Sequence, residues 1–279
     1  LSGKFSAPAG LFASRQQEAD AHADLLRRLS FALWAGEHNQ YVGALQGMLL
    51  ERLVAGFKFG LGAGVGPRAA AVGWVVQAQA LLCVRVLAVR VAPEHLTALW
   101  PIAMAELQRV LLAPATAPPP LLLAACQLID TLLCVLPDDF SSFGWMFVPA
   151  APVAGGGAAA AGASADFAAL LAPLARMEPA GDAAADAGDA ADAAAAAPPP
   201  SRGLLRPSAD GRRRPLLGLR KIESAADLAP FASELHNHLA RSALQRRGGE
   251  VDRPMVDRLI GCEFLAPHLA HEELAAEWE

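Results

Sequence analysis

Alanine makes up more than half of the residues from Ala150 to Ala197, and most of the others are glycine, aspartate and proline. Alanine favours helix locally, but its side chain offers little apolar area to bury, so the entropy of ordering such a stretch is not recovered. We therefore expect a long disordered insertion that adds nothing to a core. Around it the chain divides into residues 1–148, the low-complexity residues 149–216, and residues 217–279, which regain helical periodicity.

Residues 1–148 carry apolar side chains at spacings of three and four, which is typical of helices. The spacing predicts helices over residues 14–35, 38–57, 67–91, 93–112 and 121–136, and Pro101 is expected to kink or split the fourth. Sustained period-two alternation is missing, so strands are not expected. The predicted fold is all-α, with antiparallel helices in an α-solenoid-like (HEAT-like) arrangement or a bundle, and the two alternatives stay open.

Composition and charge exclude several classes of protein. The chain is 54% hydrophobic and carries a net charge of −5, which does not suit a cationic nucleic-acid binder. The most apolar stretch, Ala69–Val91, is interrupted by Gln77, Gln79, Arg85 and Arg90, so we interpret it as a buried helix and not a membrane span. The chain begins with Leu1 and not with methionine, which we interpret as a piece of a longer protein.

The residues that could carry chemistry do not form a recognisable catalytic or metal motif. The glycine-rich run at residues 60–66 lacks the spacing of a dinucleotide-binding loop and follows a helix, so we expect an interhelical loop. We interpret the four cysteines as free thiols in a reducing compartment, and the late histidines as surface residues: Cys83, Cys126, Cys134, Cys262; His236, His238, His268, His271. We therefore expect neither catalysis, nor a metal, nor a cofactor.

A basic tract lies beside the insertion and includes a single acidic residue, Asp210. Its seven cations are Arg202, Arg206, Arg212, Arg213, Arg214, Arg220 and Lys221. Such a tract can contact anionic lipid headgroups, although a solvated linker is the plainer alternative. After it, Ser224 and Asp227 are spaced as a helix cap, with apolar residues following at Leu228, Phe231, Leu235 and Leu239.

One segment, residues 81–101, is more specific than these patterns. It contains an Arg-Val-Leu-Ala-Val-Arg helix from Arg85 to Arg90, followed by Ala92-Pro-Glu-His-Leu-Thr-Ala-Leu-Trp-Pro101. The segment resembles the C-terminal region of the Dopey family, as do Asn39-Gln-Tyr41 upstream and Ala125-Cys-Gln-Leu-Ile-Asp130 downstream. The resemblance covers about residues 14–148 and is looser over 220–264. The matching signature residues are Arg85, Arg90, Pro93, His95, Leu96, Thr97, Leu99, Trp100 and Pro101.

The resemblance implies a non-enzymatic scaffold segment of a large cytosolic protein that associates peripherally with Golgi and endosomal membranes. Dopey proteins act in traffic between the late Golgi and endosomes. They work with a scaffold related to Arf exchange factors and with an aminophospholipid flippase, and animal members can link to kinesin-1. For the signature residues the resemblance implies structural roles: Pro93 and Pro101 would set a helix break and Trp100 would fill the core. The alternatives are a purely structural cap of a helical solenoid and an uncharacterised helical enzyme.

Overall fold

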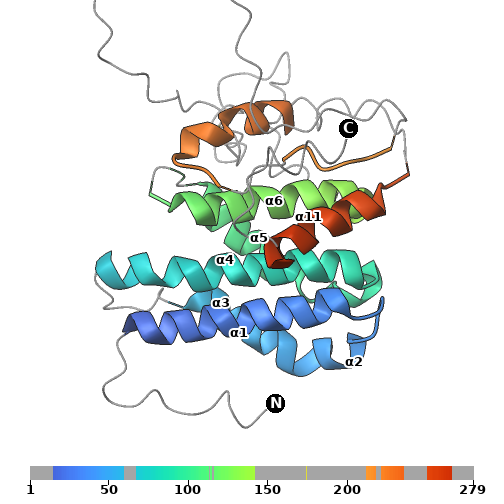
Figure 1. Ribbon diagram of the computed structural model, residues 1–279, viewed down its shortest axis with the longest axis horizontal. Helices are drawn as coiled ribbons and strands as arrows, with labels where there is room; N and C mark the ends of the chain where they lie inside the picture. Colours follow the sequence, from blue (N-terminus) through green and yellow to red (C-terminus); the bar gives the residue numbers. More distant parts are fainter. Residues whose placement is uncertain are drawn as a thin grey trace, which may run out of the picture. The chain divides into compact units, whose positions relative to one another are not determined.

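The computed structural model describes residues 15–59, 67–112, 114, 116–141, 174, 212–217, 221–235 and 250–265. Its named elements are helical (Figure 1): α1 (Arg15–Ala35), α2 (Val42–Ala44), the π-helical turn η2 (Leu45–Leu49), α3 (Leu50–Lys58), α4 (Pro67–Arg90), the 3-10 turn η3 (Pro93–His95), α5 (Trp100–Leu111), α6 (Pro119–Val135), α7 (Pro137–Ser141), the 3-10 turn η5 (Ala225–Leu228) and α11 (Arg253–Leu265). Between described residues, the structure has one isolated β-bridge, from Arg213 to Val251. The predicted all-α class is confirmed.

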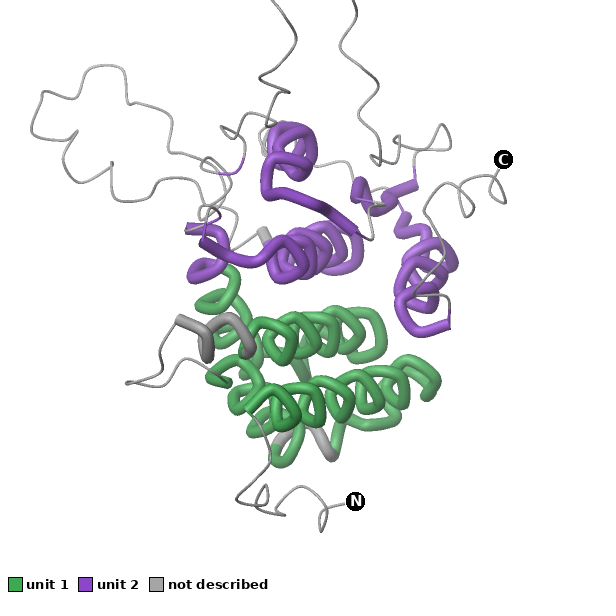
Figure 2. The backbone as a smooth tube through the Cα atoms, turned by 60° about the vertical axis from the view of Figure 1, so that its left-hand side comes forward, with its two compact units in different colours: residues 1–107 green, residues 108–279 purple. Residues whose placement is uncertain are grey.

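The chain divides into two compact units, shown in different colours in Figure 2. Unit 1 covers Leu1–Leu107 and unit 2 covers Gln108–Glu279. The division falls inside α5, and hence within the stretch 1–148 that composition treats as one part. Each unit is therefore described by itself.

Unit 1 is built on α1, α3 and α4. The α1 helix packs along α4, and its buried stripe has the three-and-four spacing of an amphipathic helix: Ala19, Ala23, Leu26, Ser30 and Leu33. The α3 helix runs antiparallel to α1 and α4 (Figure 1). In agreement, Phe59, just after the end of α3, lies beside His22 near the start of α1, with ring centroids 5.0 Å apart. The three helices approach closely at Gly56, where an added Cβ would lie 3.2 Å from Leu26 and 3.3 Å from Ala80.

The α4 helix is the core of unit 1. Its stretch Gly73–Arg90 is long and apolar enough to cross a membrane by length and composition, but 72% of it is buried inside the protein. Pro67 stands at its first position, where the missing N–H costs no hydrogen bond. Gln77 is buried with its amide turned toward the end of α3, where it donates to the backbone oxygen of Phe59 at 3.1 Å. This burial agrees with the interpretation of α4 as a core helix.

A tight corner joins α1 to the end of α4. Asn39 has a φ of 62°, a left-handed conformation that asparagine tolerates better than most residues. Its backbone N–H donates to the oxygen of Arg90 at 2.9 Å, and its Oδ1 accepts the N–H of Ala92 at 2.8 Å. Asn39 thus satisfies two backbone groups where α4 ends. Because this conformation is not α-helical, the helix predicted over 38–57 begins only at Val42, and it then passes through the π-helical turn η2.

The helix predicted over 93–112 is split, as Pro101 led us to expect. Pro93 opens the short turn η3, and α5 begins at Trp100, so that Pro101 occupies the first turn. The side chains of Leu96, Leu99 and Trp100 are buried, with Trp100 only 8% exposed. The expectation that Trp100 lies in the core agrees with this burial.

Unit 2 contains α6, which is buried on nearly all sides. Pro118 is its extended N-cap and Pro119 its first residue, which explains where it begins. The turn η5 packs against α6 and starts with a capping box, in which Ser224 and Asp227 satisfy each other's backbone N–H groups, as the sequence predicted. Leu228, the last residue of η5, is fully buried, and so, or nearly so, are Phe231 and Leu235, which follow it in the chain.

Part of the predicted insertion lies among the described residues. Leu174 is helical and its side chain is fully buried, so this one residue of the predicted insertion does contribute to a core. Residues 212–216 are also described and belong to unit 2. The remaining expectations for the insertion, the glycine run 60–66, Leu239 and the histidines His236, His238, His268 and His271 fall outside the described residues.

Replacing Asn39 tests the corner. Asn39→Ala should lower the free energy of unfolding by about 1–2 kcal/mol, because it removes the acceptor for the Ala92 N–H and disfavours the positive φ. Asn39→Asp keeps an acceptor oxygen and should lower the free energy of unfolding least. Asn39→Gly tolerates the positive φ but lacks the acceptor, so its loss should lie between those of the Asp and Ala variants. Urea denaturation followed by circular dichroism measures the series. Equal losses for Ala and Asp would contradict this role.

Candidate functional site

The most highly organised polar site among the described residues lies in unit 2. Asp130, in the middle of α6, is only 3% exposed. Its two carboxylate oxygens accept the backbone N–H groups of Leu216 at 3.0 Å and of Leu217 at 2.7 Å. A buried carboxylate is costly unless it is hydrogen-bonded, and here two N–H donors satisfy it. Asp130 therefore fixes residues 216–217 on α6.

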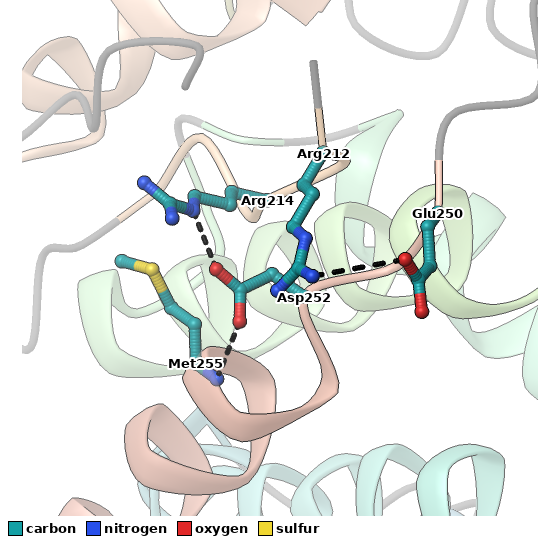
Figure 3. Close-up of polar contacts among 5 residues, drawn as sticks. All are labelled: Arg212, Arg214, Glu250, Asp252 and Met255. Carbon is teal, nitrogen blue, oxygen red and sulfur yellow. Dashed lines mark hydrogen bonds and ion pairs between the residues drawn. The ribbon is translucent and has the colours of Figure 1, made fainter. Parts of the chain in front are cut away.

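The same segment is held a second time, by residues 250–252 (Figure 3). Arg213 forms a parallel bridge with Val251: its N–H donates to the oxygen of Glu250 at 2.8 Å, and its own oxygen accepts the N–H of Asp252 at 3.0 Å. The Nε of Arg214 donates to Oδ2 of Asp252 at 2.6 Å. We call Asp130, residues 212–217 and residues 250–252 together the clasp.

Asp252 has a second task within the clasp. Its Oδ1 accepts the N–H of Met255 at 3.2 Å, so the carboxylate caps the N-terminus of α11 while its other oxygen holds Arg214. The pair is well shielded, since the side chains of Arg214 and Asp252 are 31% and 10% exposed. The neighbouring pair of Arg212 and Glu250 is looser, at 3.8 Å with side chains 48% and 80% exposed.

The thiols near this site are inert. Burial raises the pKa of Cys126 and of Cys134 far above the ordinary value, and the charge of Asp130 raises both further. In unit 1, burial raises the pKa of Cys83 to about 12, against a smaller lowering by its hydrogen bond with Ser30. A protonated, buried thiol is neither a nucleophile nor a metal ligand. These cysteines are free, as expected, and Cys262 is free and half-buried.

Four of the cations proposed for lipid contact are described. The structure brings Arg212, Arg213 and Arg214 into the clasp, where Arg212 and Arg214 face carboxylates and Arg213 is half-buried. Lys221 is exposed. Arg202, Arg206 and Arg220 lie outside the described residues. Two residues of the tract therefore help to hold unit 2 together, Arg213 through its backbone and Arg214 through its guanidinium group.

The family-signature residues divide between core and surface. Arg85, Leu96, Leu99 and Trp100 are buried, whereas Arg90 and Pro93 are half-buried. His95, Thr97 and Pro101 are exposed. In the described part of the chain no group of three histidine, cysteine, aspartate or glutamate side chains could hold a metal ion.

Sequence reasoning missed the residues that organise the site. The charged Asp130 within a mostly apolar helix was a signal that a partner must exist, but nothing local identifies the partner. Asp252 precedes Arg253-Pro254, an ordinary helix start, so its cap could have been predicted but not its pairing with Arg214.

Comparison with known proteins places these residues in a family. The family model described as DOP1 C-terminal matches residues 2–238. The protein DOP1 homolog of Drosophila melanogaster is 38% identical over 105 residues, which cover 37% of this chain and 4% of that protein. Protein pad-1 of Caenorhabditis elegans and protein DOP1B of Mus musculus are each 30% identical over stretches covering 50% of this chain, and 6% and 7% of their own lengths.

The matched stretches are thus small parts of much longer relatives. No solved structure matches the chain significantly.

The two arginine pairs of the clasp offer a matched test. Arg214→Ala should lower the free energy of unfolding by about 1–3 kcal/mol, because it leaves the shielded Asp252 carboxylate without its charged partner. Arg212→Ala should cost about 0–1 kcal/mol, since its pair is long and exposed. Urea unfolding of both variants measures the difference. Equal losses would contradict the assignment of Arg214 to the clasp.

Proposed function

Because the chain belongs to the DOP1 (Dopey) family, we propose that it is a non-enzymatic scaffold segment of a large protein that acts in vesicle-mediated transport between the late Golgi and endosomes. The observation that carries the proposal is the family match over residues 2–238, which covers nearly all of unit 1 and most of unit 2.

The site of action that we propose is the cytosolic face of Golgi and endosomal membranes, with peripheral attachment. The proposed partners follow from the family resemblance alone: an Arf-exchange-factor-related Golgi scaffold, an aminophospholipid flippase and kinesin-1. A second candidate function is a structural cap of a longer helical solenoid. Burial of Leu96, Leu99 and Trp100 favours it, because the most specific part of the signature then serves the core.

Partner capture from cytosol separates the two functions. The bait should be the whole chain and not residues 1–148, because Asp130 in α6 needs the N–H groups of Leu216 and Leu217. A scaffold segment should recover the Arf-exchange-factor-related protein, and the Trp100→Ala bait should recover less, because loss of a core indole destabilises the fold. If the bait recovers none of the three proposed partners, the structural cap is supported instead.

Direct lipid contact is proposed for the basic tract. Among its described cations Lys221 is exposed and Arg212 is the less committed of the paired arginines, so these two are the best placed. Each cation near an anionic leaflet contributes about 1 kcal/mol, and salt screens the attraction within about 8 Å at physiological strength.

Sedimentation with phosphoinositide-containing vesicles tests this contact. The double variant Arg212→Ser with Lys221→Ser should lose roughly tenfold or more in vesicle affinity at low salt, through loss of two cations. The matched control is Arg28→Ser with Lys58→Ser, which removes two exposed cations from unit 1. Equal sedimentation of the two double variants, or no sedimentation of the wild type, would contradict lipid contact through this tract.

A further inference from the structure

The segment that leads into η5 carries a serine between two exposed acidic residues. Ser224 is half-buried, while Glu223 before it and Asp227 three positions after it are exposed. The Asp227 carboxylate accepts the N–H groups of Glu223 at 2.8 Å and of Ser224 at 2.9 Å, and it accepts the Ser224 hydroxyl at 3.4 Å. The serine hydroxyl therefore lies beside an exposed carboxylate and not within the core.

A serine with an acidic residue three positions later is the pattern that acid-directed protein kinases select. In the whole sequence, Ser224 is the only serine or threonine with such a neighbour. Ser233 is exposed in the same described segment, but the residue three positions after it is His236. A kinase of this class can therefore distinguish Ser224 from every other hydroxyl of the chain.

The same serine caps a segment that covers part of α6. In the capping box the Ser224 oxygen accepts the N–H of Asp227, and the Asp227 carboxylate satisfies the N–H groups of residues 223 and 224. The turn η5 packs against α6. The apolar side chains that this cap positions are buried: Ile222, Ala225, Ala226 and Leu228. A change at the Ser224 oxygen therefore acts on the start of a buried segment.

We propose that Ser224 is a phosphorylation site of an acid-directed kinase, and that its phosphate opens the capping box and loosens η5 from α6. The γ-phosphoryl group of ATP is transferred to the serine oxygen: a new P–O bond forms, the bond to the β-phosphate oxygen breaks, and ADP and the hydroxyl proton leave. The phosphate adds a charge of about −1.5 to −2 beside the Asp227 carboxylate and removes the hydroxyl hydrogen that this carboxylate accepts. Like-charge repulsion then displaces Asp227 from its N–H donors.

Incubation of the full chain with casein kinase II and ATP tests the acceptor. Mass spectrometry of proteolytic peptides should find phosphate on Ser224 and none on Ser233. Asp227→Asn should lower the initial rate of phosphorylation about tenfold or more, because a charged contact with the kinase is lost. Asp227→Glu keeps an acid at this position and should be phosphorylated nearly as fast as wild type. An unmodified Ser224 in the native chain, or equal rates for the two variants, would overturn the proposal.

Thermal unfolding tests the effect on η5. The phosphorylated chain should melt about 2–6 °C below the unmodified chain, as expected for loss of a helix cap in a chain of this length. It should also bind more ANS, a dye that reports exposed apolar surface. Ser224→Ala is the control, since it lacks the acceptor oxygen and its melting temperature should not respond to the kinase. An unchanged or higher melting temperature of the phosphorylated wild type would show that the capping box stays closed and would contradict the proposal.

Discussion

A single buried carboxylate determines how unit 2 is organised. Asp130 lies in a helix whose other buried side chains are almost all apolar, and in that environment an ion must be matched by donors. The donors are backbone groups, so the requirement is for a chain in the right conformation and not for a particular side chain. Once residues 216–217 are in place, Arg213 and Arg214 reach residues 250–252, and Asp252 caps α11. The hydrogen bonds to Asp130 thus help to orient the segments of unit 2 that pack apolar side chains around α6.

Unit 1 also depends on polar groups that satisfy backbone groups of a distant element. Here the side chain and the backbone N–H of one loop residue satisfy the backbone groups at the end of a helix. Asn39 closes the corner after α1 by binding backbone groups at Arg90 and Ala92. Close packing does the rest: Gly56 lets α3 lie against Leu26 of α1 and Ala80 of α4 with almost no room to spare. The break at Pro93 and the burial of Trp100 follow where α4 ends. The family-signature stretch thereby spans the end of a core helix and the start of the next one.

Much of this fold could be predicted from the sequence, because its signals are local. The three-and-four spacing locates α1, α4 and α6 to within a few residues, proline marks the starts of α4 and α6, and Ser224 with Asp227 marks η5. What could not be predicted depends on contacts between distant residues. The left-handed φ of Asn39 depends on Arg90 and Ala92, and the role of Asp130 depends on Leu216. Composition assigned residues 212–216 to the insertion because proline and arginine resemble a linker, whereas pairing with 250–252 and Asp130 gives them a place in unit 2.

The separation between the two sides of the clasp has a consequence for synthesis on the ribosome. Asp130 and Leu216 are 86 positions apart, so the helix that carries the carboxylate leaves the exit tunnel long before its donors do. At roughly 5–20 residues per second, the interval is on the order of ten seconds. During this interval the carboxylate of Asp130 must stay hydrated, and the part of α6 that residues 216–217 later cover must stay exposed. Completion of unit 2 is therefore timed by translation of residues 142–217, and any pause in that stretch lengthens the period in which a nascent chain exposes α6 to chaperones.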